Sequence, residues 1–404
     1  MDAFIARQPI FNEKKQLFAY ELLFRDGLSN FMPDIEGDVA TSKLLSSTYF
    51  TIGIDKITNG KRAFINFTEN LLVDEFPLLF PKETTVIEIL EDVNPNENVI
   101  RVSQKFSANG YLLALDDFVF HPDLKPLIAL ADIIKIDFRQ TPPDEIERYI
   151  SEGHLQGAKL LAEKVETYEE FNLALELGFE YYQGYFFSKP EIIKGSDISS
   201  SQFRLLEIVA SVNKPDFEFD TVEKLVQSDL SISYKLLRCI NSVFFKRKGE
   251  ITSIRQALVY LGQNEIRRFV SLIALSSVTT VKPTELIRSC CIRARFCELL
   301  SSVSECAEPA DELFTIGLFS NIDAVLDQPM ADIMAKLPLS PKIVSTLTKG
   351  RNELSKYLSL SKCYEIGDWQ SVRNLAAELC IAEENIPPIY LKACEWANAI
   401  AASH

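Results

Sequence analysis

The first half of the chain alternates short apolar segments with longer amphipathic ones, and this alternation is what most limits the possible folds. The strand-like segments are LFAYELLF, RAFINF, TVIEIL, YLLALDDF, DIIKIDF, KLLAEKV and YYQGYFF. Amphipathic segments such as VATSKLLSSTYF and TYEEFNLALELG lie between them. Strands that alternate with helices indicate a parallel sheet, and strands that are apolar on both faces indicate a covered sheet, as in a barrel or a doubly wound fold.

The second half of the chain has helical periodicity only. Apolar residues recur at three- and four-residue spacing in segments such as TELIRSCCIRARFCELLSSV and DELFTIGLFSNIDAVL. A polar, Ser-rich segment separates the two halves and is typical of a linker. We therefore predict an α/β domain over residues 1–193, a linker over 194–202 and an all-α domain over 203–404.

Composition and charge restrict the class of partner. A chain of 404 residues with 47% hydrophobic and 25% charged residues can form two domains with full cores. Its formal charge of -15 argues against a nucleic acid as the main partner, because no basic cluster is present to neutralise phosphates. No basic leader and no apolar run of roughly 18 residues is found, so we predict a cytoplasmic protein that does not contact a membrane.

The cysteines and histidines are informative mainly by their positions. All eight cysteines lie beyond residue 238 without a C-x-x-C motif, and we interpret them as buried free thiols of a reducing compartment. The only histidines are His121, His154 and His404, so the second domain cannot contain a histidine metal cluster.

Side chains that can bind a cation or activate an oxygen lie at or near the ends of the predicted strands. They are Glu21, Asn66, Glu88, Glu91, Asp116, Asp117, Lys135, Asp137, Glu163 and Gln183. Any one of these acids alone is better explained as a solvated loop residue. In a (β/α)8 barrel, however, the carboxyl ends of the strands meet at one face, so the series predicts a single site.

The composition of this site favours hard cations. Carboxylates and one amide oxygen suit Mg²⁺ or Mn²⁺ rather than zinc. Two such ions roughly 4 Å apart would lower the pKa of a bridging water and stabilise an in-line attack on phosphorus.

Eight ordered motifs resemble the EAL domain of cyclic di-GMP phosphodiesterases. They are FIARQPIF, YELLFR, INF, EILE, LDDF, IKID, AEKVE and QGYFFSKP, and they cover residues 3 to 190. The resemblance implies an α/β modified TIM barrel that hydrolyses one phosphodiester of cyclic di-GMP to linear pGpG with two divalent cations.

The resemblance also assigns roles to individual residues. One metal would be held by Glu21, Asn66, Glu88 and Asp116, and Asp117 would hold the second metal and bridge to the nucleophilic water. The remaining roles are water activation for Lys135, metal or water binding for Glu163, positioning for Gln183, phosphate contact for Arg25 and loop anchoring for Glu91. Glu21, Lys135 and Glu163 are therefore the predicted catalytic residues.

Three departures from the family pattern lie beside these positions. Leu22 replaces the Ala of the name motif, and VFHPDLKP follows DDF in place of the Gly- and Ser-rich loop that orders the metals and the dimer contact. Val119 would resist the backbone conformations that glycine permits there. Lys164 replaces a Gly, and we expect its side chain to point to solvent. These departures leave open an active enzyme, a slow enzyme, a cyclic di-GMP sensor and a scaffold, and a homodimer is one alternative for the assembly.

The helical half resembles the HDOD domain. The matching segments are LLRCINS, ITSIRQALVYLG, ELFTIGLFSNIDAVL, LPLSPKIVSTL and YEIGDW, over roughly residues 200 to 375. Ser320 and Asn321 stand where an HD hydrolase carries its His-Asp pair, so we expect no hydrolysis there. The resemblance implies a bacterial EAL-HDOD signalling protein whose helical domain regulates or binds a protein partner. The helix CCIRARFCELL could offer a docking face, but we expect it to pack in the core.

Overall fold

The computed structural model describes two compact units. They are residues 1–187 with Tyr364–Gln370, and residues 188–363 with Ser371–His404. The described residues are 3–26, 54–155, 157–189, 212, 256–257, 259–262, 265–270, 283–337 and 339–401. The predicted linker over 194–202 and the predicted helix VATSKLLSSTYF lie outside them.

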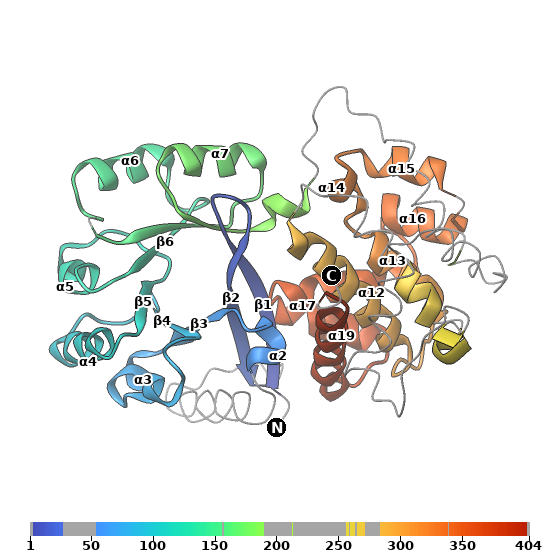
Figure 1. Cartoon of the computed structure of the whole chain (residues 1–404), viewed down its shortest axis with the longest axis horizontal. Coiled ribbons are helices and arrows are strands. Elements are labelled where there is room, and N and C mark those ends of the chain that lie inside the picture. The colour runs from blue at the N-terminus through green and yellow to red at the C-terminus, as the bar shows by residue number, and fades with distance from the viewer. Residues whose placement is uncertain are drawn as a thin grey trace. The chain divides into compact units, whose positions relative to one another are not determined.

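The first unit contains a closed barrel of eight strands (Figure 1). They are β1 (Ala3–Asn12), β2 (Leu17–Asp26), β3 (Arg62–Phe67), β4 (Thr85–Ile89), β5 (Leu112–Leu115), β6 (Ile133–Asp137), β7 (Lys159–Glu163) and β8 (Tyr181–Gln183). Neighbours from β2 to β8 are parallel, whereas β1 is antiparallel to both β2 and β8. A regular TIM barrel is parallel throughout, so this is the predicted modified barrel.

Strand β1 is absent from the strands predicted by apolar pattern, although its FIARQPIF motif is part of the EAL resemblance. It forms a hairpin with β2 through a tight turn at Asn12, whose side chain accepts hydrogen bonds from the backbone N–H groups of Lys14 and Gln16. The last predicted strand of the first domain, YYQGYFF, is only partly a strand. It continues after Gln183 as a 3₁₀ helix, η4 (Tyr185–Ser188).

Each strand contributes one residue to a packed layer of buried side chains. The layer consists of Ile10, Ala19, Phe64, Val86, Ala114, Ile133, Leu161 and Tyr181. Filling of the interior by one side chain from every strand makes the barrel a solid core, which supports the carboxyl ends of the strands.

Helices lie around the outside of the barrel (Figure 1). They are α2 (Ile54–Thr58), α3 (Glu69–Val73), α4 (Glu97–Ala108), α5 (Lys125–Ile128), α6 (Pro143–Ser151) and α7 (Tyr168–Glu176), with 3₁₀ turns η2 (Phe76–Leu79) and η3 (Pro122–Leu124). Two of these helices begin at capping residues that can be read from the sequence. Asn96 caps α4, and Thr167 with Glu170 forms a capping box at α7.

The second unit is helical in every element that is described. Its elements are α12 (Thr284–Ser301), α13 (Ala310–Phe319), α14 (Ile322–Leu326), α15 (Met330–Lys336), α16 (Pro341–Lys349), α17 (Glu353–Glu365), α18 (Trp369–Glu378), η6 (Glu383–Asn385) and α19 (Ile386–Ala401). The last residues of α17 and the first residues of α18 belong to the first unit. In the described part of the chain, no helix is long and apolar enough to cross a membrane.

Helix α12 lies in the core of this unit. Cys290, Cys291 and Cys297 are buried, and Phe296 packs edge-on against Tyr390 of α19. Helix α13 approaches so closely that a Cβ on Gly317 would lie 2.5 Å from the Ala294 Cα. The expected core role of CCIRARFCELL is thus confirmed.

Candidate active site

The predicted site residues come from successive barrel strands. Glu21 lies within β2, Asn66 in β3, Glu88 in β4, Lys135 in β6, Glu163 at the end of β7 and Gln183 at the end of β8, while Asp116 and Asp117 directly follow β5. The parallel register sets Asn66 beside Glu88. The backbone N–H of Asp116 donates to the Ile89 carbonyl, which holds the two acids beside β4.

A fully buried lysine lies at the centre of these residues. The Lys135 Nζ is 2.7 Å from an Asp116 oxygen, 2.8 Å from Glu163 and 3.6 Å from Glu21. It also donates to Glu88, whose side chain is fully buried. Four carboxylates from four parts of the chain therefore surround one ammonium group.

The resulting charge imbalance shifts the pKa values of the group. Burial alone would lower the pKa of Lys135, but the charges of the surrounding carboxylates outweigh it and raise that pKa well above the ordinary value. Burial raises the pKa of Glu88 well above its ordinary value, against the opposing charge of Lys135. Burial also raises the pKa of Glu163 to about 8, again against Lys135. The positive charge of one lysine is thus not enough to keep all four surrounding carboxyl groups ionised.

Two amides hold Glu21 in place. Asn66 Nδ2 lies 3.3 Å from Glu21 Oε1, and Gln183 Nε2 donates to Glu21 Oε2 at 2.6 Å. Gln183 Nε2 also lies 2.9 Å from Gln8 Oε1, and Gln8 is paired with Glu21 across the hairpin. Gln8 was missed by the sequence reasoning, and only the register of β1 against β2 could have indicated it.

Several oxygens at this site accept no hydrogen bond within the described part of the chain. They are Asn66 Oδ1, Glu88 Oε2, Glu163 Oε2 and Gln183 Oε1, and all four are buried. A buried acceptor without a donor is costly, and a bound cation would supply the missing partner. These oxygens, with the surrounding carboxylates, fit a hard divalent cation such as Mg²⁺ or Mn²⁺.

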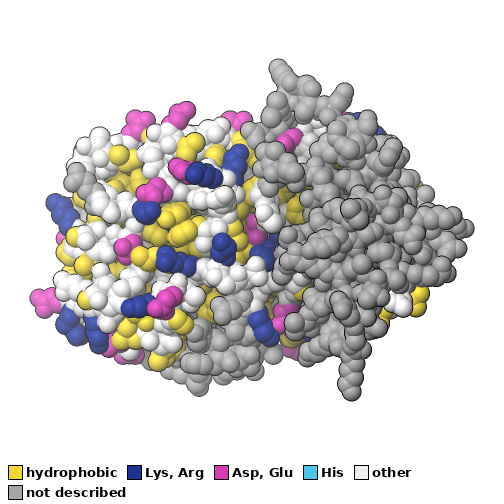
Figure 2. All heavy atoms as spheres, in the orientation of Figure 1, with side chains coloured by type: hydrophobic (Ala, Val, Ile, Leu, Met, Phe, Trp, Pro, Cys, Tyr) yellow, Lys and Arg dark blue, Asp and Glu magenta, His cyan; other side chains and the backbone are white. Residues whose placement is uncertain are grey.

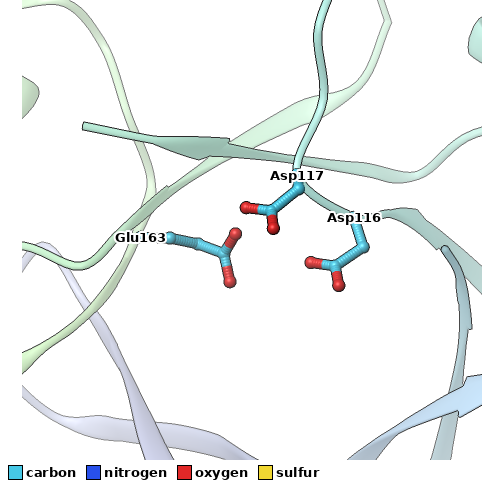
Figure 3. A group of neighbouring side chains, drawn as sticks. All are labelled: Asp116, Asp117 and Glu163. Atoms are coloured by element: carbon cyan, nitrogen blue, oxygen red, sulfur yellow. The ribbon is translucent and has the colours of Figure 1, made fainter. Parts of the chain in front are cut away.

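A second group of acids faces a common space. Asp116, Asp117 and Glu163 each offer an oxygen, and the three oxygens lie within 4.8 Å of one another (Figure 3). Figure 2 shows basic and acidic side chains interspersed over the visible face of the barrel unit.

The Lys164 side chain is 44% exposed, as expected, but its ammonium lies against two carboxylates. Its Nζ lies 2.5 Å from Asp137 Oδ2 and 3.5 Å from Asp117 Oδ1. Burial and the hydrogen bond to Asp137 oppose each other, and the pKa of Lys164 is raised overall. The parallel register of β6 and β7 sets Asp137 beside Glu163, so the ammonium of the next residue finds acids within reach. Lys164 is a charged neighbour of the predicted second metal ligand.

Left-handed backbone near the site occurs at Asp117 and Lys164, and Val119 does not adopt it. Val119 is 58% exposed and does not have a positive φ, whereas Asp117 has φ +38° and Lys164 has φ +55°. Phe118 is buried against Tyr149 in an edge-on contact, which anchors the segment directly after Asp117. Val119 is expected to resist glycine-like backbone conformations and does not adopt one; the left-handed residue of this segment is Asp117.

The structure gives fewer contacts for the other predicted residues. Arg25 belongs to β2, but its side chain lies outside the described residues. Glu91 is exposed in the turn that follows β4. Leu22 is completely buried, so the larger side chain beside Glu21 is accommodated by packing.

Comparison with known proteins supplies the family. The EAL domain model matches residues 44–190, and the HDOD domain model matches residues 201–337. Over 98% of its length the chain is 38% identical to the cyclic di-GMP phosphodiesterase CdgJ of Vibrio cholerae serotype O1, of which it covers 93%. The chain belongs to the EAL-HDOD family. It is also 37% identical to the uncharacterized protein YuxH of Bacillus subtilis, with 98% of each chain covered.

A solved structure is similar to the EAL domain. The PaMucR phosphodiesterase in complex with c-di-GMP matches 46% of this chain and 95% of its own, at 19% identity and a TM-score of 0.39.

In the HDOD domain, Ser320 and Asn321 are part of a buried polar contact. Arg293 Nη1 donates to Asn321 Oδ1 at 2.8 Å and lies 3.3 Å from Ser320 Oγ. These two residues also divide the predicted segment DELFTIGLFSNIDAVL into α13 and α14.

Proposed function

We propose that the EAL domain is a metal-dependent phosphodiesterase that hydrolyses cyclic di-GMP to linear pGpG. Membership of a family that includes a cyclic di-GMP phosphodiesterase supports the substrate. The observation that carries the proposal is the set of four carboxylates around buried Lys135, with acceptor oxygens that still need a partner.

The ligand roles follow the two groups of acids. Glu21, Asn66, Glu88 and Asp116 would hold one cation, and Asp117 with Glu163 would hold the second; Mg²⁺ and Mn²⁺ suit this donor set. When bound, two divalent cations would neutralise charge on the phosphodiester and lower the pKa of a water at phosphorus.

The other residues orient the reacting groups. Lys135 keeps its proton because of the surrounding carboxylates, and with cations paired to those carboxylates its ammonium would be able to donate a hydrogen bond to the attacking water or to a phosphate oxygen. Glu163 Oε2 accepts no hydrogen bond within the described residues, so with the Glu163 proton displaced by a cation it would be able to accept a hydrogen bond from that water. Gln183 fixes the orientation of Glu21. Arg25 as a phosphate contact and Glu91 as a loop anchor remain predictions.

We further propose that the protein acts in the cytoplasm and that its HDOD domain regulates the EAL domain or binds a protein partner. Hydrolysis within the HDOD domain is not part of this proposal, because Ser320 and Asn321 stand where the resemblance would put a His-Asp pair, and both contact Arg293 instead of forming a histidine metal site.

A second candidate function is that of a cyclic di-GMP sensor with little or no turnover. It is favoured by the contact between Lys164 and Asp117, which places a positive charge 3.5 Å from an oxygen that the second cation would need. Loss of one cation would slow hydrolysis while leaving a pocket able to bind the nucleotide.

The deciding experiment is incubation of the full-length protein with cyclic di-GMP and Mg²⁺ or Mn²⁺, followed by chromatographic separation of the nucleotides. We expect pGpG to form, and we expect Glu21→Gln to abolish its formation. The matched control is Glu147→Ala, which changes an exposed glutamate on α6. Circular dichroism checks that both variants fold.

The alternatives give different results. Absence of pGpG together with calorimetric binding of cyclic di-GMP would support the sensor. Absence of both turnover and binding would contradict both proposals and leave a scaffold.

A further inference from the structure

Two cysteines of the helical unit differ from its buried cysteines because they are exposed and lie next to each other in space. Cys290, Cys291, Cys297 and Cys394 are buried, whereas Cys306 and Cys380 are exposed. The Sγ atoms of Cys306 and Cys380 lie 3.6 Å apart, although the residues are 74 positions apart in sequence. The prediction that the cysteines are buried thiols is therefore wrong for this pair.

The pair is held together by the surrounding structure. Cys306 lies in the connection between α12 and α13, and Ser304 of that connection donates to the Leu379 carbonyl at 2.7 Å. The backbone N–H of Glu305 reaches the Cys380 carbonyl at 3.5 Å. Buried Tyr357 has its hydroxyl 2.8 Å from Ser304 Oγ and 3.0 Å from the Cys306 carbonyl. These contacts fasten the segment that contains Cys306 to the end of α18.

The backbone of Cys380 supports the same conclusion. Cys380 has φ +51°, and the N–H groups of Cys380 and Ile381 donate to Ala377 and Ala376, which is the Schellman pattern at the end of α18. Glycine is the usual residue at this left-handed position, and a side chain there is strained. The strained residue places its thiol next to the second exposed thiol.

We propose that Cys306 and Cys380 form a reversible regulatory disulfide within the helical unit, between the HDOD match at residues 201–337 and the helices that follow it. The oxidant would be a small-molecule disulfide such as oxidised glutathione. One cysteine thiolate attacks a sulfur of that disulfide, forms a mixed disulfide and releases one small thiolate. The second cysteine thiolate then attacks the protein-bound sulfur and releases the second. Two protein thiols are oxidised, one small disulfide is reduced to two thiols, and the two protein-derived protons end on these thiols.

The disulfide would link the connection between α12 and α13 covalently to the end of α18. An exposed disulfide in a protein of a reducing compartment is a redox-sensing rather than a structural feature. Closure would stabilise the helical unit, because the bond would restrict a long loop of the unfolded chain.

The test uses the full-length protein, first reduced and freed of reductant, then incubated with oxidised glutathione. We expect an intact mass lower by two hydrogens, two fewer thiols reacting with Ellman's reagent, and a cross-linked peptide pair that contains Cys306 and Cys380. Thermal unfolding should shift upward by roughly 5 °C and return after addition of dithiothreitol.

Substitutions separate this bond from other thiol chemistry. Cys306→Ser and Cys380→Ser should each abolish the cross-link, and Cys363→Ser, which changes a half-buried cysteine, should leave it unchanged. A stable glutathione adduct without the cross-linked peptide, or a cross-link that persists in Cys306→Ser, would overturn the proposal. Because Cys306 lies in a connection between helices, its serine variant tests the proposal even if Cys380→Ser does not fold.

Discussion

At the scale of single residues, Lys164 combines backbone strain with charge. Its φ of +55° lies in the left-handed region, where a residue other than glycine costs roughly 1–2 kcal/mol. Its ammonium is within reach of both Asp137 and Asp117. A single substitution at this position can therefore change both the stability of the turn after β7 and the charge available to a cation.

We predict that Lys164→Gly raises the affinity for Mn²⁺ roughly tenfold, because one positive charge near Asp117 is removed, a difference of about 1.4 kcal/mol. Isothermal titration calorimetry with Mn²⁺ measures this. Lys164→Asn is the matched control, because asparagine tolerates a left-handed backbone but carries no charge. Equal gains in both variants would assign the effect to charge, and unchanged affinity in both would contradict the prediction.

At the scale of elements, the end of β8 is locked to the turn that follows β7. The Val165 N–H donates to the Gln183 carbonyl at 3.0 Å, and the Phe186 N–H donates to the Val165 carbonyl at 3.1 Å. Gly184, between these bonds, has φ +145°, and a Cβ there would lie 2.0 Å from the Val165 carbonyl oxygen. This junction positions the predicted catalytic residue Glu163 and the positioning residue Gln183.

We predict that Gly184→Ala lowers the free energy of unfolding of the protein by at least about 2 kcal/mol and abolishes phosphodiesterase activity, because a Cβ would force the two backbones apart. Denaturant unfolding and the nucleotide assay measure the two effects. Gly178→Ala is the matched control. Gly178 also has a positive φ, of +85°, but a Cβ added there would have no described atom within 4 Å, so only backbone strain of roughly 1 kcal/mol is expected. Similar losses in the two variants would argue against the clash.

The barrel strands that bury both faces could be predicted, because a continuous apolar run is visible in the sequence without knowledge of which strands pair with it. β1 could not be predicted in this way, because Arg7 and Gln8 interrupt its apolar pattern and its place in the sheet comes from antiparallel pairing at both edges. That the acids form one site could be predicted, because each lies at or near the end of an apolar strand-like segment. The central position of Lys135 depends on the registers of several strands, which one sequence does not reveal.

At the scale of the whole molecule, the acidic site links stability to pH and metal. In the folded protein the pKa of Glu163 is about 8, against an ordinary value of 4.5. The folded state therefore holds a proton that the unfolded chain releases. Its contribution to stability is complete below the ordinary pKa and is lost as the pH rises to about 8.

We predict that the Tm of the EDTA-treated protein falls as the pH is raised from about 5 to about 8, and that Mn²⁺ reverses most of this fall by pairing with the ionised acids. Differential scanning fluorimetry across this range, with and without Mn²⁺, measures it. Glu163→Gln cannot lose this proton, so its metal-free Tm should depend less on pH. A wild-type curve that matches the curve of this variant would contradict the assignment.

The pairing of β1 with β8 also has a consequence for how the chain is made. During translation the β1–β2 hairpin leaves the ribosome before the other barrel strands, yet one of its edges has no neighbour until Tyr181–Gln183 has emerged. Barrel closure is therefore a late event of synthesis, and the nascent hairpin is exposed to wrong partners meanwhile. A truncated chain limited to the EAL match at residues 44–190 would never close, because it would lack the hairpin and leave β3 and β8 as unpaired, aggregation-prone edges.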